Sequence, residues 1–295
     1  MASEWEKYQD EIFRKHRQRY FDVEENQSEE LDDEFRDLQD DFEEVVYDYS
    51  SGDTVDESIL GSKDFEIILV AGLASMLNVM AKHNQQVYRI GGDWGVDMVR
   101  PYGRPGLVSE LETQVSRLTQ RTGDRFAFRR FPADNKTVGS RIKTIEGSTL
   151  RGVQNLLAVQ INEGRSAPQI AGALKNYIKK DDRRKWVSPF EWYRKRFGYK
   201  VGKPNNIRGG SLDYNVYRIA RTEINYAWRD SSVTLHDGKD YLEGFDWVLS
   251  HAHPRPDICD DWAADGPYNS ASDVPDGHAN CMCSVVPRVK KPEDL

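Results

Sequence analysis

The pattern of hydrophobic positions predicts helices along most of the chain, because apolar residues recur at intervals of three and four. The clearest stripe is formed by Leu150, Val153 and Leu157, and Gly164 follows it where a left-handed cap residue belongs. Ser166 is placed to cap the next helix. Helices are therefore expected over residues 4–21, 31–46, 62–82, 110–121, 149–162, 167–178 and 211–227.

Two regions depart from this helical spacing. Glycines and prolines crowd residues 91–106, which predicts a loop. The three glycines that open it do not form a phosphate-binding loop, because no strand precedes them and no Lys-Ser/Thr pair follows. Near the end of the chain, residues 244–249 and 283–286 have the composition of short strands. The sequence thus predicts a mainly α-helical fold with a small α+β module at the C-terminus.

Charge is distributed unevenly. The first 62 residues carry 21 acidic and 6 basic side chains, whereas the rest of the chain carries 28 acidic and 35 basic ones. We expect residues 1–60 to form an acidic amphipathic helical arm, whose apolar stripe needs a partner in its own domain or in another subunit. Residues 61–204 would form a mainly helical body and residues 205–295 the C-terminal unit. No signal peptide is expected, and the longest apolar stretch, residues 67–80, is too short to span a bilayer.

All three cysteines and three of the six histidines fall between residues 251 and 283. Thiolates and imidazoles are the ligands that tetrahedral Zn²⁺ prefers. The best set of four ligands comprises Cys259, His278, Cys281 and Cys283. His251, His253 and Asp257 are reserve ligands. The segment has few apolar residues, so zinc would help to stabilise it. The alternatives are three buried thiols beside a surface histidine, or a disulfide between Cys259 and Cys281 formed after cell lysis.

Two sequence blocks resemble a known protein family. The first reads Arg255-x-x-x-Cys259, then Gly266, then Pro275-x-x-His278-x-Asn280-Cys281-x-Cys283. The second is Ile219-Ala-Arg-Thr-Glu223. They are similar to the C-terminal motif and the Ala-Arg-Thr-Glu segment of phage Mu F-like minor head proteins, the phage head morphogenesis family. Upstream, residues 162–171 resemble the Gly-x-Ser-x-x-x-Ile-Ala helix entry of the same family, so the resemblance covers about residues 145–290. The chain departs from the family pattern at Ala279 and Met282, where Pro and Arg are usual, and at Trp262, where many relatives carry another Cys.

This resemblance implies a virion component, present in few copies and associated with the portal. Such a protein acts in head morphogenesis, or in DNA packaging and ejection, by binding and not by catalysis. The implied partners are the phage portal protein, a scaffold or the major capsid protein, and viral duplex DNA, with no membrane during assembly. The implied location is the capsid interior or portal vertex, after synthesis in the host cytoplasm.

A basic, aromatic stretch offers a surface for non-specific DNA contact. Residues 179–203 hold ten Lys or Arg and three acids, interleaved with aromatic side chains. The candidate DNA-contacting residues are Arg183, Arg184, Lys185, Arg194, Lys195 and Arg196. A second contact zone is expected from Arg121, Arg125, Arg129, Arg130, Arg141 and Lys143. The alternative is a solvated helix and loop whose aromatic side chains belong to the core or rest against the portal.

Arg221 and Glu223 allow two interpretations. The favoured one is a structural latch, in which both side chains make buried or interfacial hydrogen bonds that fix the C-terminal module on its helix. The rival is a metal-dependent nuclease or toxin-like enzyme with Glu223 as general base beside the Cys/His cluster. A zinc-ribbon nucleic-acid binder of host origin is a third reading, disfavoured because the chain has no paired Cys-x-x-Cys.

Overall fold

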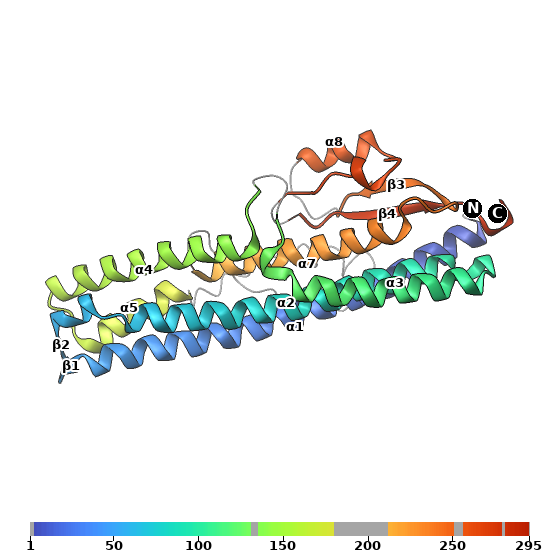
Figure 1. Ribbon diagram of the computed structural model, residues 1–295. Helices are drawn as coiled ribbons and strands as arrows, with labels where there is room; N and C mark the ends of the chain where they lie inside the picture. Colours follow the sequence, from blue (N-terminus) through green and yellow to red (C-terminus); the bar gives the residue numbers. More distant parts are fainter. Residues whose placement is uncertain (1–2, 131–134, 180–211, 251–255, 279–280, 295) are drawn as a thin grey trace.

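The protein is an elongated helical bundle that carries a small sheet-containing module on one side (Figure 1). The computed structural model describes residues 3–130, 135–179, 212–250, 256–278 and 281–294. The helices are α1 (Glu4–Asp48), α2 (Asp64–Val99), α3 (Pro105–Asp124), α4 (Val138–Asn162), α5 (Ala167–Ile178), α7 (Leu212–His236) and α8 (Ile258–Asp265). The strands are β1 (Ser50–Ser51), β2 (Thr54–Val55), β3 (Leu242–Val248) and β4 (Ser284–Val289). The predicted fold class, mainly α-helical with a small C-terminal α+β module, is confirmed.

The acidic N-terminal region is one continuous helix of 45 residues and not two shorter ones. Ser3 caps it through a capping box with Glu6, since each residue's side chain bonds the other's backbone amide. Its apolar stripe is buried mainly against α2 and α5, while the acids other than the buried Glu24 are exposed or half-buried. The partner that the stripe requires therefore lies within the same chain.

The predicted loop over residues 91–106 is wrong in its first part, because α2 continues through the glycines to Val99. These glycines sit where neighbouring helices come close. A Cβ at Gly92 would lie 2.6 Å from a methyl group of Val115 on α3, and one at Gly95 would lie 2.5 Å from Leu235 on α7. The glycines of α2 thus indicate close packing between helices and not a turn of the chain. The true turn follows at residues 100–104, where Gly103 has a left-handed φ of +64°.

Several predicted helix ends agree with the structure. Gly164 adopts a left-handed φ of +65° directly after α4. Ser166 begins α5 with a capping box to Gln169. At α2 the helix begins at Asp64, whose amide donates to the hydroxyl of Ser62. Local sequence chemistry therefore governs where these helices begin and end.

Together with the turn that follows it, α2 forms a helical run, Asp64–Tyr102, that is long and apolar enough to cross a membrane; its most apolar 18-residue window has a mean hydropathy of 1.6. Core helices of soluble proteins meet the same criterion. The second half of α2 is buried, and the helix packs against α1, α3 and α7. Length and hydropathy alone therefore do not assign α2 to a membrane.

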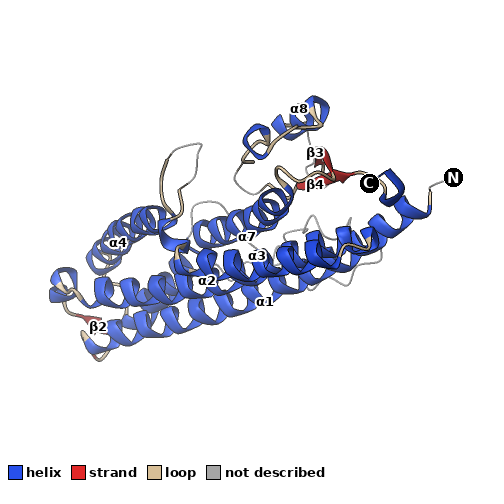
Figure 2. Cartoon of the chain, turned by 45° about the vertical axis from the view of Figure 1, so that its right-hand side comes forward, coloured by secondary structure: helices blue, strands red, loops and turns tan. Residues whose placement is uncertain are grey.

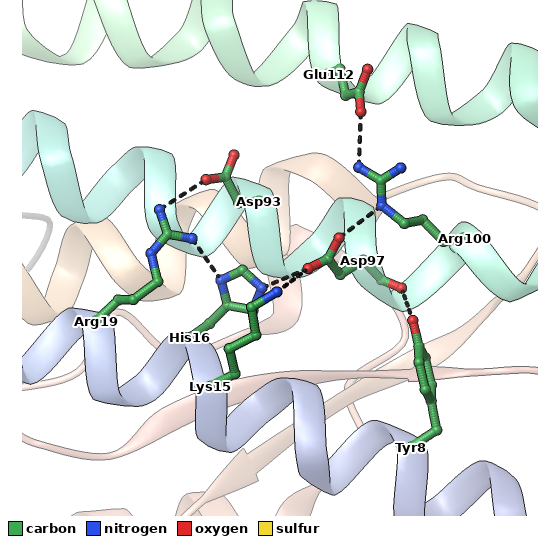
Figure 3. A network of polar contacts seen from close by, with 8 residues as sticks. All are labelled: Tyr8, Lys15, His16, Arg19, Asp93, Asp97, Arg100 and Glu112. Atoms are coloured by element: carbon green, nitrogen blue, oxygen red, sulfur yellow. Dashed lines mark hydrogen bonds and ion pairs between the residues drawn. The ribbon is translucent and has the colours of Figure 1, made fainter. Parts of the chain in front are cut away.

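A polar network joins the first turns of α1 to the end of α2 (Figure 3). His16 is 1% exposed, and its Nε2 lies 2.8 Å from a carboxylate oxygen of Asp97. A guanidinium nitrogen of Arg19 lies 3.2 Å from His16 Nδ1. Because a guanidinium only donates, Nδ1 must accept and Nε2 must carry the proton. Burial lowers the pKa of His16, which agrees with this neutral form.

The C-terminal module rests on α7 (Figure 2). Its strands β3 and β4 pair antiparallel, with Trp247 opposite Val285 and a bulge between Leu242 and Gly244. A small core lies beneath them, formed by Val233, Phe245, Trp247, Val285 and the three cysteines. The module therefore has its sulfur atoms in its core, and partly buried side chains, among them Trp262 and Tyr268, pack against this core.

Candidate functional site

The three cysteines of the chain meet in one buried cluster. Cys259 lies in the first turn of α8, held there by the N-cap Asp257, whose carboxylate accepts from the Cys259 amide at 2.8 Å. Cys281 and Cys283 lie on either side of Met282, in the segment that leads into β4. Their three sulfur atoms lie within 4.8 Å of one another, and each residue is at most 2% exposed. Three buried cysteines this close together can hold a metal ion.

His278 lies at the open side of the cluster. Its Nε2 is 3.2 Å from the sulfur of Cys259 and 3.4 Å from a carboxylate oxygen of Asp257. The sulfurs of Cys259 and Cys281 are 3.6 Å apart, so the two cysteines are not joined as a disulfide. Thiolates bound to one tetrahedral zinc would be about 3.8 Å apart. The spacing of the Cys259 and Cys281 sulfurs is close to this value, whereas His278 groups with Asp257 and Cys259 and not with Cys281 or Cys283.

The charge on the sulfurs is set by their neighbours. A hydrogen bond from Cys259, helped by the guanidinium of Arg229, lowers the pKa of Cys281 well below its usual range. The contacts of Cys259 with Cys281 and Cys283 raise the pKa of Cys259. The backbone amide of Ser250 donates to the sulfur of Cys283 at 3.4 Å. A metal ion binds thiolates, so binding one would release the protons that the three thiols hold.

Two side chains of α7 hold the cysteine strand in place. Asn225 is fully buried, and its amide nitrogen donates to the carbonyl oxygens of Cys281 at 2.6 Å and Cys283 at 3.1 Å. Arg229, one helical turn later, donates to the sulfur of Cys281 at 3.2 Å and to the carbonyl of Asp276 at 3.1 Å. These contacts orient two of the candidate ligands from outside the metal site.

Sequence reasoning missed the structural role of Asn225 and Arg229. The available signal was that both are polar, lie four residues apart and share a helix whose other positions are largely apolar or small. A buried polar residue needs a partner, so such a pair on a core helix indicates a built contact.

The two candidate latch residues lie on the same helix but bind different elements. Arg221 donates from Nε to a carboxylate oxygen of Glu24 on α1 at 3.1 Å. Glu223 is fully buried and pairs with Arg129, whose guanidinium nitrogen lies 3.0 Å from its carboxylate. Burial raises the pKa of Glu223, while Arg129, Arg141 and Arg229 oppose this rise. These two ion pairs connect α7 to α1 and to the segment that follows α3.

The remaining predicted contacts divide into three groups. Arg183, Arg184, Lys185, Arg194, Lys195 and Arg196 lie outside the described residues, as do the reserve ligands His251 and His253. Within the second predicted zone, Arg121, Arg125 and Arg129 line one pocket. Lys143 instead pairs with Glu146, and Arg130 donates to the carbonyl of Asn135 at 2.9 Å. Arg141 lies near the carboxylate of Glu223, as Arg129 does, so the residues of this zone make several different contacts.

The site joins a thiolate cluster to a helix that also anchors α1 and the loop before α4. No protein-family model, curated protein sequence or solved structure matches this chain.

Proposed function

We propose that this chain is a phage minor head protein, present in few copies at the portal vertex, that acts in head morphogenesis or in DNA packaging and ejection. One observation carries the proposal. Asn225 and Arg229, on the helix of the Ile219–Glu223 block, contact Cys281 in the Cys/His block, although the contacting residues are more than 50 positions apart in the sequence. A shared motif is expected to form one such structural unit.

The proposed metal is zinc, bound by Cys259, His278, Cys281 and Cys283. The support is the buried three-sulfur cluster and the His278 nitrogen that lies 3.2 Å from Cys259. Four such ligands leave no open position for a substrate, which is the arrangement of structural zinc. Zinc would then stabilise the module on α7 and would not supply chemistry.

The proposed partners are the portal protein, a scaffold or the major capsid protein, and viral duplex DNA, with no membrane during assembly. The acidic outer face of α1 offers carboxylates to a basic partner surface. Non-specific duplex DNA would contact the basic stretch of residues 179–203. The protein would pass from the host cytoplasm into the virion.

The decisive experiment measures where the chain resides in its phage. Peptides of the chain are quantified by mass spectrometry in gradient-purified precursor heads and mature particles, against portal and major capsid peptides. We expect the chain in at least one particle, far below the major capsid protein in amount. Its absence from both particles, with abundant chain in the free lysate, would overturn the proposal.

The rival function is a metal-dependent nuclease that uses Glu223. The burial of Glu223 and its pairing with Arg129 speak against a general base, because the side chain has no exposed surface on which a substrate could contact it. Incubation of duplex and single-stranded DNA with the metal-loaded protein tests it. Cleavage by the wild type that is lost in Glu223→Gln would replace the binding role with catalysis.

A further inference from the structure

A pocket of about 630 Å³ opens where the end of α3 meets α2 and α7. Its wall combines three arginines with apolar and aromatic side chains. The arginines are Arg121, Arg125 and Arg129, and the other lining residues are Tyr88, Leu118, Thr122, Phe128, Asp230 and Thr234. This volume lies within the range of pockets that take small molecules or single nucleotides.

Two of the arginines, Arg121 and Arg125, carry charge that no carboxylate of the described residues neutralises in an ion pair. Arg121 and Arg125 are exposed, four residues apart, and the structure gives them no ion pair among the residues it describes. Arg129 differs, because its guanidinium is held by Glu223 at 3.0 Å and lies over the ring of Tyr226 at 3.3 Å. Arg121 and Arg125 are thus the cations available to an anionic ligand.

The one carboxylate in the wall offsets only part of this charge. Asp230 is hydrogen-bonded by Tyr88 and Thr234, and burial raises its pKa. The carboxylate of Asp230 thus already has hydrogen-bond donors within the protein, whereas Arg121 and Arg125 give the pocket positive charge. A ligand that places an anion at the rim meets no free carboxylate there.

Phe128 adds an exposed aromatic face. It is 78% exposed, the largest value among the bulky apolar side chains of the described chain, and it stands on the short turn Phe126–Phe128 directly after the arginines. Its neighbour Phe126 is buried and anchors the same turn. Aromatic side chains next to arginines are the usual platform for an unpaired base and its phosphate.

We propose that this pocket binds an unpaired nucleotide, with the base against Phe128 and Leu118 and the phosphate on Arg121 and Arg125. The ligand is either a free nucleotide or a nucleotide within a single strand. The inference goes beyond the proposed virion role, since it rests on the pocket alone and would hold for a chain that never enters a particle.

The test measures binding of the full-length protein to three probes: a fluorescein-labelled oligothymidylate by anisotropy, a blunt duplex by anisotropy, and dTMP by calorimetry. The variants are Phe128→Ser and the double variant Arg121→Gln/Arg125→Gln. Arg117→Gln is the matched control, because Arg117 is an exposed arginine one turn earlier on α3 that does not line the pocket. Circular dichroism melts establish that each variant is folded.

We expect Phe128→Ser to weaken oligothymidylate binding by roughly tenfold, the loss of one stacked base. The double variant should weaken it further and reduce the slope of log K against log salt by about 1.4, as for two lost phosphate contacts on a single strand. Arg117→Gln should bind as the wild type does. Tight dTMP binding by the wild type identifies a free nucleotide as ligand, and binding of the oligomer alone identifies a strand.

Three results would overturn the proposal. The first is unchanged oligothymidylate affinity in both pocket variants, which assigns binding to residues 179–203. The second is a wild type that binds the blunt duplex as tightly as it binds oligothymidylate, together with a Phe128→Ser variant whose oligothymidylate affinity is unchanged. The third is a double variant that loses thermal stability but keeps its affinity, which means that the arginines only balance the C-terminal end of α3. A negative result in this binding test would not bear on the mass-spectrometric search for the chain in phage particles, and a negative result there would not bear on nucleotide binding.

Discussion

The side-chain amide of Asn225 bridges the carbonyl oxygens of Cys281 and Cys283, at 2.6 and 3.1 Å. One residue of α7 therefore fixes the backbone on both sides of Met282 and sets the direction of two sulfur atoms. The helix does more than support the module, because it sets the geometry of a candidate metal site from a position outside it.

Replacing Asn225 by Ala should leave two buried carbonyls without their donor. We expect the free energy of unfolding to fall by about 1–3 kcal/mol and the zinc affinity to fall by about 10–100-fold. Urea unfolding and competition with a chromophoric chelator measure the two effects. Asn176→Ala is the control, because Asn176 makes an exposed bond within its own helix. Unchanged zinc affinity in Asn225→Ala would show that the amide serves the fold alone.

Chemical modification of the three thiols should release the bound zinc. The chain has three cysteines, and all three lie in the cluster. Titration with an organomercurial reagent should therefore release all bound zinc as the third thiol reacts, as followed with a zinc-sensitive dye. His278→Ala should keep zinc with lower affinity, and Cys281→Ser should lose most of it. Protein that contains no zinc after chelator-free purification, and takes up none, would contradict the zinc assignment.

Glu223 and Arg129 should show a large coupling energy in a double-mutant cycle. Removing only Glu223 leaves a partly buried guanidinium without its carboxylate, so Glu223→Ala should cost on the order of 3–5 kcal/mol. The double variant Glu223→Ala/Arg129→Leu should recover part of that loss. Chemical unfolding of the four proteins gives the cycle. If the two single-variant losses in the free energy of unfolding simply add up in the double variant, Glu223 and Arg129 do not stabilise the fold as a pair.

Two helical glycines, Gly92 in α2 and Gly172 in α5, should respond to alanine substitution with opposite changes in stability. Gly92→Ala places a methyl group against the stiff side chain of Val115, at 2.6 Å, and should destabilise the protein by about 1–3 kcal/mol. Gly172→Ala in α5 meets open space and should stabilise it by roughly 0.5–1 kcal/mol. Thermal and urea unfolding of both variants measure this. Equal effects would refute close packing at Gly92.

Acid should weaken the fold through His236. Burial lowers the pKa of His236 to about 3, whereas an unfolded chain has a histidine pKa of about 6.5. Between these values the unfolded chain binds a proton that the folded chain does not, so the free energy of unfolding falls as the pH falls below about 6.5. This contribution is absent above that pH, and its slope is about 1.4 kcal/mol per pH unit.

The measurement compares urea unfolding of the wild type and His236→Gln at several pH values between 7.5 and 4. The variant should be less stable at pH 7.5 but should lose less stability per pH unit, by about 1.4 kcal/mol. His16 and His83 also have lowered pKa values and remain in both proteins, so their contributions cancel. Parallel pH curves would exclude His236 as a titrating group.

Local features were predictable from the sequence, and long-range contacts were not. The stripe of α4, the cap at Ser166 and the gathering of cysteines follow from residue spacing alone. Gly91–Gly95 misled because a glycine signals a turn and a close helix crossing equally well, and only the position of Val115 decides between them. Asn225 could not be assigned, because its partners lie 56 and 58 residues away.

Arg17 of α1 lies against Tyr20 and Trp228 and donates to the carbonyl of Met282, a residue 265 positions later. Tyr20 and Phe21 share a core with Met282 and Val289. A ribosome needs about 15–60 s to make 295 residues. Until residues 282–289 have been made, the start of the nascent chain lacks part of its core, so chaperones would have an exposed aromatic helix to hold.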